Sequence, residues 1–362
     1  MQSSASGLEL KGVGKAFGAV RVVQELDLAV QQGEFVVLLG ASGCGKSTVL
    51  RMIAGLDEVS EGRIFIHGRD VTDLAPMRRD IAMVFQAYAL YPHMDVAHNM
   101  GFALELAGAG RAEIEQRVRK AAEILNIGHL LGRKPRELSG GQRQRVAIAR
   151  ALAISPSLLL MDEPLASLDT PARASLRAEL RGLLAGAGIP AILVTHDQSE
   201  ALELADHAAL MIEGSVRHVG PIAEVFSRPQ DDACAAAIGV ESVLPGRIER
   251  VEEGIAHVRV GGALLAALAP PEFDGVDVLV CIRASDVLLS PDGVGTMSAR
   301  SRLAGRVTSL MQEPSLVRVG IDCGFALTAL VTRAAARELA LAPGLPIVAS
   351  IKATNVHLIP RR

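Results

Sequence analysis

Two hydrophobic patterns alternate in the first part of the chain. Short apolar runs such as "EFVVLLG" (34–40) and "AILVTH" (191–196) have the length and composition of buried strands. The stretches "STVLRMIAGL" (47–56) and "DQSEALELADHA" (197–208) place their apolar residues on one side of a helix. Strands that alternate with helices are typical of a sheet with helices packed on its faces. The pattern therefore predicts an α/β domain over residues 1–235.

A helical segment interrupts this alternation. The stretch "RAEIEQRVRKAAEIL" (111–125) is strongly amphipathic, and its charges have the spacing of a solvated helix face. We therefore expect a helical subdomain over about residues 87–155, inserted in the α/β domain.

The pattern changes downstream of this domain. Short β-like runs are now separated by glycine and proline, and the sequence repeats itself. The segment "IRASDVLLSP" (282–291) corresponds in residue type to "IKATNVHLIP" (351–360) at eight of ten positions. Two similar β units placed side by side explain such a repeat. We expect a β-rich domain over residues 236–362, with units at 241–293 and 298–360.

A glycine-rich loop joins the first strand-like run to the helix that follows it. Its sequence, "GASGCGKS" (40–47), is the phosphate-binding pattern GxxxxGK[ST]. Glycines let backbone N–H groups converge on an anion at a helix N-terminus, Lys46 adds a full charge for the outer phosphates, and the Ser47 hydroxyl is a ligand for Mg²⁺. A dinucleotide-binding loop would need a third glycine where Thr48 stands. The candidate nucleotide-binding residues here are Gly40, Ala41, Ser42, Gly43, Cys44, Gly45, Lys46, Ser47 and Thr48.

Two adjacent acids end another apolar run, "SLLLMDEP" (157–164). Two adjacent carboxylates at the end of a buried strand cost free energy of folding unless they meet a cation or water. Asp162 is therefore the candidate that holds Mg²⁺ through water. Glu163 is the candidate that polarises the water attacking a γ-phosphate, because an ordinary glutamate is ionised at neutral pH.

Three other segments carry candidate site residues. The glycine turn in "LSGGQ" opens a helix, so that Ser139, Gly140 and Gly141 form a second anion-binding site. One nucleotide seldom needs two such sites, which indicates that the second serves a nucleotide held by another copy of the chain. His196 ends one apolar run, where it could contact a γ-phosphate, and Gln86 ends another.

Composition narrows the classes of function. The 362 residues carry 37 basic and 40 acidic side chains, a formal net charge of −3, so we expect no nucleic-acid partner. Four scattered cysteines without paired spacing argue against a disulfide framework and a zinc site, and suit a reducing compartment. We also expect no signal peptide and no membrane span, so attachment to a membrane would need another protein.

Taken in order along the chain, the glycine loop, Gln86, "LSGGQ", "MDEP", Asp169 and "TH" resemble the nucleotide-binding subunit of ABC transporters. Residues 34–100 are similar to the maltose-importer class of bacterial ATPases, which also carries a β-rich regulatory domain, so the resemblance spans the chain. It implies a P-loop ABC ATPase fold with ATP and Mg²⁺ as ligands. It also implies a homodimer on the cytoplasmic face of the inner membrane, bound to two integral membrane permease subunits and served by a solute-binding protein.

The resemblance also implies roles for single residues. Phe17 would stack on adenine, where the family often has Tyr. Gln86 would link Mg²⁺ and the attacking water to the permease, and His196 would hold the γ-phosphate. The glycine turn of "LSGGQ" would bind ATP across the homodimer. Ala166 stands where this class usually has Ser, a departure that bears on the contacts of its loop across the dimer, although Asp169 is retained.

The tail carries a second resemblance. "SARSRLAGRV" and the stretch 329–359 are similar to the Mop-type, OB-like TOBE fold of molybdate proteins, although the usual "SARN" reads "SARS" here. The resemblance implies an oxyanion site, which we expect near Ser298, Arg300 and Lys352. The expected transported solute is molybdate, tungstate or a similar oxyanion, with a sugar, a polyamine or another small solute as the alternative.

Two other classes of protein remain open. A soluble ABC ATPase without a transport role usually carries two cassettes or a long coiled-coil insertion. An oxyanion sensor or store would use the cassette only as a scaffold. The single signature and the intact Lys46, Asp162 and Glu163 favour an ATPase that energises transport.

Overall fold

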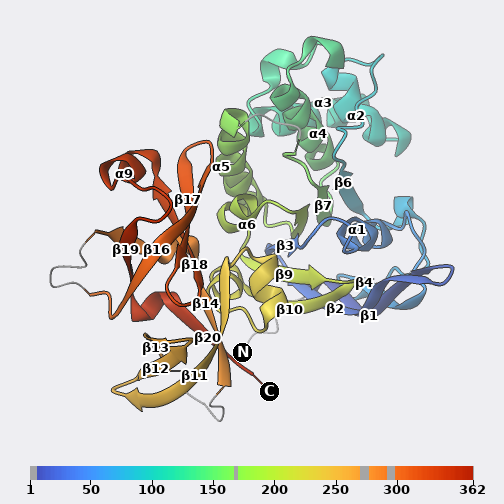
Figure 1. Ribbon diagram of the computed structural model, residues 1–362. Helices are drawn as coiled ribbons and strands as arrows, with labels where there is room; N and C mark the ends of the chain where they lie inside the picture. The colour runs from blue at the N-terminus through green and yellow to red at the C-terminus, as the bar shows by residue number, and fades with distance from the viewer. Residues whose placement is uncertain (1–5, 167–169, 270–276, 292–297, 362) are drawn as a thin grey trace. The chain divides into compact units, whose positions relative to one another are not determined.

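The computed structural model describes residues 6–166, 170–269, 277–291 and 298–361. The chain divides into two compact units, Met1–Val225 and Phe226–Arg362, each with its own hydrophobic core (Figure 1). The division falls inside helix α7 (Ile222–Ser227), whereas the sequence pattern placed the end of the α/β domain at residue 235. All the phosphate-binding motifs lie in the first unit, and the β repeat lies in the second.

The first unit is built on a six-stranded sheet with the order β10-β9-β3-β8-β7-β6. Strands β9, β3, β8, β7 and β6 run parallel, and β10 is antiparallel to β9. Strands β3 and β8 bury every side chain, which explains their continuous apolar sequences. The bounds are β3 (Phe35–Leu39), β6 (Ile81–Val84), β7 (Leu158–Asp162), β8 (Ala191–Thr195), β9 (His207–Ile212) and β10 (Ser215–Pro221).

An antiparallel sheet with the order β2-β1-β4-β5 shares its core with the parallel sheet. Leu10 and Leu26 of this sheet, Leu50 and Ile53 of helix α1, and Leu38 of β3 belong to one buried cluster. This packing fixes the start of α1 beside the end of β3. The bounds are β1 (Ser6–Phe17), β2 (Val20–Gln31), β4 (Glu61–Ile66), β5 (Arg69–Asp70) and α1 (Lys46–Ala54).

Helices α2, α3 and α4 follow β6 and precede β7 along the chain, and they pack on one another. They form the teal and green group at the top of Figure 1. Helix α3 covers the amphipathic stretch that was predicted to be helical, and it buries Val118, Ala121 and Ala122. No helix in the described ranges combines the length and the apolar character that crossing a membrane requires. The bounds are α2 (Val96–Leu106), α3 (Arg111–Ile124), α4 (Gly140–Ala153), α5 (Thr170–Ala187) and α6 (Gln198–Leu204).

The second unit contains two five-stranded antiparallel sheets, whose orders β13-β12-β11-β14-β20 and β18-β17-β16-β19-β15 correspond strand for strand. The last strand of each repeat pairs with a strand of the other repeat, because β15 pairs with β19 and β20 pairs with β14. Where the two repeats exchange these strands, the Asn355 side-chain amide, just before β20, donates to the Asp286 carboxylate, just before β15, at 3.0 Å. The two β units are therefore interlocked around one core.

The elements of the second unit explain the repeated sequence. In both copies a strand, one short 3-10 turn and a second strand follow one another. The bounds are α8 (Asp232–Ala237), β11 (Ser242–Glu252), β12 (Ile255–Val260), β13 (Ala263–Leu268), β14 (Asp277–Ile282), β15 (Leu288–Ser290), β16 (Ser301–Gln312), β17 (Leu316–Asp322), β18 (Ala326–Thr332), α9 (Arg333–Glu338), β19 (Pro346–Ile351) and β20 (Val356–Pro360).

Candidate functional site

The candidate site lies where four parallel strands end. The glycine loop follows β3, Gln86 follows β6, Glu163 follows β7 and His196 follows β8. Because β6, β7, β8 and β3 are neighbours in register, their carboxyl ends form one edge of the sheet. Ligands of open α/β sheets bind at such an edge.

The glycine loop has a backbone that few other residues could adopt. Gly45 caps α1 with φ 105°, in the left-handed region, and no side chain caps the first N–H groups of the helix. At Gly40 a side chain would collide with the backbone carbonyl of Met211 in β9. The loop is therefore held tightly against the sheet, with uncapped helical N–H groups that favour an anion.

Lys46 is buried in this loop, with only 5% of its surface exposed. Its ammonium group donates hydrogen bonds to the backbone carbonyls of Gly40 and Ala41, both at 2.8 Å. A buried cation held by neutral carbonyls gains from exchanging them for an anion, because charge-assisted hydrogen bonds are stronger. Lys46 is thus positioned for a phosphate group.

Ser47 and Asp162 meet beside the loop. The Ser47 hydroxyl donates to the Asp162 carboxylate at 3.0 Å. Burial raises the pKa of Asp162, as does the nearby charge of Glu163, while the bond from Ser47 lowers it. A half-buried carboxylate next to a hydroxyl oxygen fits Mg²⁺, which takes oxygen ligands and is usually held by one or two protein groups plus substrate phosphates.

Glu163 lies between the two other predicted catalytic side chains. Its carboxylate is 2.9 Å from Nδ1 of His196 and accepts a hydrogen bond from the Gln86 amide at 3.3 Å. The Glu163 backbone is in the left-handed region (φ 43°), and its N–H donates to the Val194 carbonyl at 2.9 Å. The structure therefore brings Glu163, His196 and Gln86 into direct contact, while Asp162 next to them is engaged by Ser47.

Other predicted residues lie apart from this cluster. Ser139 caps α4, where its hydroxyl accepts from the Gln142 N–H at 3.3 Å and its own N–H donates to the Gln142 side chain at 3.0 Å. Within the described part of one chain, no hydrogen bond joins Ser139, Gly140 or Gly141 to the glycine loop. Phe17 is 52% exposed, and the ammonium of Lys15 lies 4.9 Å from its ring centre. Asp169 lies outside the described residues.

Sequence reasoning missed a buried network behind His196. The Thr195 hydroxyl donates to the Glu200 carboxylate at 2.7 Å and accepts from the Asp197 N–H at 3.0 Å. Burial raises the pKa of Glu200. These bonds fix the turn that carries His196. The signal was present as a threonine at the end of an apolar strand, followed five positions later by a glutamate in the first turn of α6.

The residues predicted for an oxyanion in the tail lie beside the paired strands β16 and β19, because Arg300 and Lys352 directly flank the paired residues at the start of β16 and the end of β19. Ser298, Arg300 and Lys352 are all exposed, and no hydrogen bond joins any two of them in the described ranges. The neighbouring Ser301 is buried, and its hydroxyl already accepts from the Ala266 N–H at 2.8 Å.

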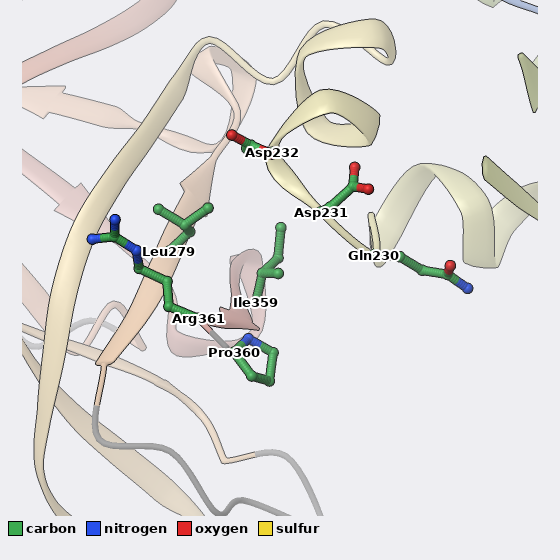
Figure 2. A pocket seen from close by; sticks show the side chains of 7 residues that line it. All are labelled: Gln230, Asp231, Asp232, Leu279, Ile359, Pro360 and Arg361. Atoms are coloured by element: carbon green, nitrogen blue, oxygen red, sulfur yellow. The ribbon is translucent and has the colours of Figure 1, made fainter. Parts of the chain in front are cut away.

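A separate pocket of about 520 Å³ lies in the second unit (Figure 2). Asp231 and Asp232 on one side and Arg361 on the other give it mixed charge, which does not favour a dianion. It contains none of the residues predicted for the oxyanion. Its lining residues are Gln230, Asp231, Asp232, Leu279, Ile359, Pro360 and Arg361.

Comparison with known proteins agrees with this geometry. The family model described as ABC transporter matches residues 23–166, and the TOBE domain model matches residues 297–358. The sn-glycerol-3-phosphate import ATP-binding protein of Burkholderia mallei is 50% identical over 254 residues, which are 69% of this chain and 70% of that protein. The molybdate/tungstate import ATP-binding protein of Pyrococcus horikoshii is 39% identical over 356 residues, which are 98% of this chain and 100% of that protein.

The chain belongs to the ABC transporter ATPases. The cassette also matches a solved dimeric structure, the bacterial ABC transporter cassette MJ0796, with a TM-score of 0.54 and 30% identity over 59% of this chain and 98% of that one. The match to the ABC family confirms the predicted cassette fold, and the TOBE match confirms the predicted β-rich tail. The matched segment 23–166 of the ATPase contains the glycine loop, Gln86, Ser139, Asp162 and Glu163.

The contact between Ser47 and Asp162 leads to a prediction about metal dependence. We expect Ser47→Ala to raise the Mg²⁺ concentration for half-maximal ATPase activity about tenfold, because it removes one oxygen from the site and a hydrogen bond that orients Asp162. ATPase rates measured across a Mg²⁺ titration test this. The exposed Ser199→Ala in α6 is the control and should leave the Mg²⁺ requirement unchanged. An unchanged requirement in Ser47→Ala would exclude Ser47 from the metal site.

Proposed function

We propose that this ATPase energises an importer by hydrolysing Mg·ATP with Glu163 as the group that activates water. The observation that carries the proposal is the division of work between the two adjacent acids. Asp162 is engaged by Ser47, whereas Glu163 faces Gln86 and His196. One acid is thereby available for a metal and the other for water.

The residues suggest how the reaction would proceed. The uncapped N–H groups of α1 and the Lys46 ammonium bind the β- and γ-phosphates. Ser47 and Asp162 would hold Mg²⁺, which neutralises charge on the phosphate oxygens. Glu163 accepts a hydrogen bond from water and takes its proton as the water oxygen bonds to the γ-phosphorus and the bond to the bridging oxygen of ADP breaks. His196, held by the network behind it, contacts the γ-phosphate oxygens.

The same proposal includes a second copy of the chain. The start of α4 presents Ser139, Gly140 and Gly141 as an anion site that, among the described residues, has no hydrogen bond to the glycine loop of its own chain. In a homodimer this site would close on the nucleotide of the partner. The dimeric form of the cassette similar to this one supports the arrangement. Two permease subunits in the inner membrane and a solute-binding protein would complete the transporter on whose cytoplasmic face the homodimer lies.

For the transported solute we propose a tetrahedral oxyanion, molybdate or tungstate. The relative whose name includes these solutes matches the chain over 98% of its length, tail included. The relative named for glycerol-3-phosphate is more identical, at 50%, but over 69% of the chain. Glycerol-3-phosphate, itself a carrier of a tetrahedral anion, is the second candidate, and a sugar or other small solute is the third.

Uptake by cells of the source organism tests the solute proposal. We expect cells that lack this chain to lose high-affinity uptake of radiolabelled molybdate, and the wild-type chain, but not Glu163→Gln, to restore it. Uptake of radiolabelled glycerol-3-phosphate and maltose in the same cells serves as the control. Loss of glycerol-3-phosphate or maltose uptake with unchanged molybdate uptake would overturn the oxyanion assignment while leaving the ATPase role intact.

A further inference from the structure

The segment that follows Gln86 has an unusual backbone. Tyr88 (φ 60°) and Ala89 (φ 47°) are consecutive non-glycine residues in the left-handed region. This conformation brings Cβ close to the following carbonyl oxygen, so each residue is there at a cost in free energy. Other contacts must hold the segment in place.

Arg150 of α4 makes those contacts. Its guanidinium donates to the Ala89 carbonyl at 2.6 Å and to the Tyr88 carbonyl at 3.3 Å. A second arginine of the same helix, Arg143, lies with its guanidinium 5.7 Å from the Tyr88 ring centre. Burial lowers the pKa of Arg150, and across the described ranges no ion pair joins it to a carboxylate. The two carbonyls are therefore the partners that compensate this partly buried cation.

The turn that Arg150 holds is bonded closely around Gln86. The Tyr88 N–H donates to the carbonyl of Phe85, the residue before Gln86, at 3.2 Å. The far end of the segment is fixed separately, because the fully buried Asn99 of α2 accepts from the Tyr91 N–H at 2.8 Å and donates to the Tyr91 carbonyl at 3.1 Å. Tyr88 and Arg150 thus link the segment that follows Gln86 to α4.

We propose that Arg150 is a positioning residue that ties the Tyr88–Ala89 turn to α4 and thereby keeps the Gln86 amide at the Glu163 carboxylate. Helix α4 begins at the Ser139 turn, so a movement of this turn shifts Gln86 through the same rigid helix. Closure of the second anion site on a nucleotide then sets the position of Gln86 at the water-activating acid. The inference rests on the proposed roles of Gln86 and Glu163.

Steady-state ATPase assays of the full-length protein test this role. We expect Arg150→Met to lower kcat about tenfold or more, because small misplacements of catalytic groups cost rates of that order, with KM for ATP changed less than about twofold. Arg150→Lys, which keeps the charge but has no planar fork to reach both carbonyls, should give a smaller loss in the same parameter. The control is Arg111→Met, whose side chain is 94% exposed on α3 and which should leave kcat and KM unchanged.

Rescue distinguishes positioning from a purely structural role. In the Arg150→Met background, Ala89→Gly should restore kcat at least about threefold, because glycine adopts the left-handed conformation without the Cβ penalty. Unchanged kcat in Arg150→Met, or a loss that Ala89→Gly does not rescue, would overturn the inference; if Arg150→Met fails to fold, the same two outcomes in Arg150→Lys decide. Glu163→Gln is assayed alongside. If it is inactive while Arg150→Met is normal, only this inference fails, whereas normal turnover in Glu163→Gln would refute the proposed function.

Discussion

The Glu163→Gln variant is expected to bind ATP normally and to hydrolyse it at least about 100-fold more slowly than the parent protein, the usual contribution of a general base. The amide has nearly the shape of the carboxylate but cannot accept a proton from water. Asp162, Ser47 and Lys46 keep their contacts, so Mg·ATP binding should persist. Phosphate release and equilibrium binding of a fluorescent ATP analogue measure the two properties separately.

A matched variant controls for the loss of one negative charge. Glu105→Gln removes an exposed carboxylate from the end of α2 and should leave turnover unchanged. Turnover of Glu163→Gln within a few fold of the parent would remove Glu163 from its proposed role. It would also leave the contact between Glu163 and His196 as a structural contact only.

The Ser139→Arg variant is expected to abolish ATP hydrolysis while each single chain still binds nucleotide. A bulky cation at the start of α4 would hold the two copies apart if this turn closes on the nucleotide of the partner. The substitution also removes the helix cap seen in the structure, at a cost of about 1 kcal/mol of stability. Ser139→Ala removes the cap without adding bulk, and we expect it to retain much more activity than Ser139→Arg.

Mixing inactive variants tests whether the second site acts on the partner. Lys46→Ala removes the phosphate-binding cation and should also be inactive. A mixed dimer of Ser139→Arg and Lys46→Ala contains one intact composite site, so ATPase activity should reappear when the two are combined. Crosslinking will show whether mixed dimers form. If they form and the mixture is still as inactive as its components, the Ser139 turn does not act on the partner's nucleotide in sites that work independently.

Much of the site could be predicted from the sequence because its chemistry is local. The glycine loop, the acid pair and His196 each follow an apolar run, and parallel strands bring their carboxyl ends to one edge of the sheet. The shared edge could be expected without the strand order, and the order β3-β8-β7 then brings His196 and Glu163 close to the loop. The contact between Gln86 and Glu163 was harder to foresee, because it depends on β6 being the neighbour of β7.

The features that escaped prediction depend on partners far apart in the chain. Arg150 has the sequence context of an ordinary helical arginine, and nothing local shows that it bonds to carbonyls 61 and 62 positions away. The exchange of β15 and β20 between the two repeats is equally hidden, because each repeat could pair its last strand within itself. The oxyanion residues of the tail were grouped by resemblance; they are exposed beside the β16–β19 pair, and the neighbouring Ser301 joins β16 to β13.

The most direct test of the account is the molar mass of purified full-length Glu163→Gln with and without Mg·ATP, measured by light scattering after size exclusion. Glu163 is expected only to activate water, and the nucleotide is expected to join two copies through the glycine loop of one and the Ser139 turn of the other. We therefore predict the mass of two chains with Mg·ATP and of one chain without it, and of one chain in both conditions when Ser139→Arg is added. A single-chain mass for Glu163→Gln at saturating Mg·ATP would contradict the account.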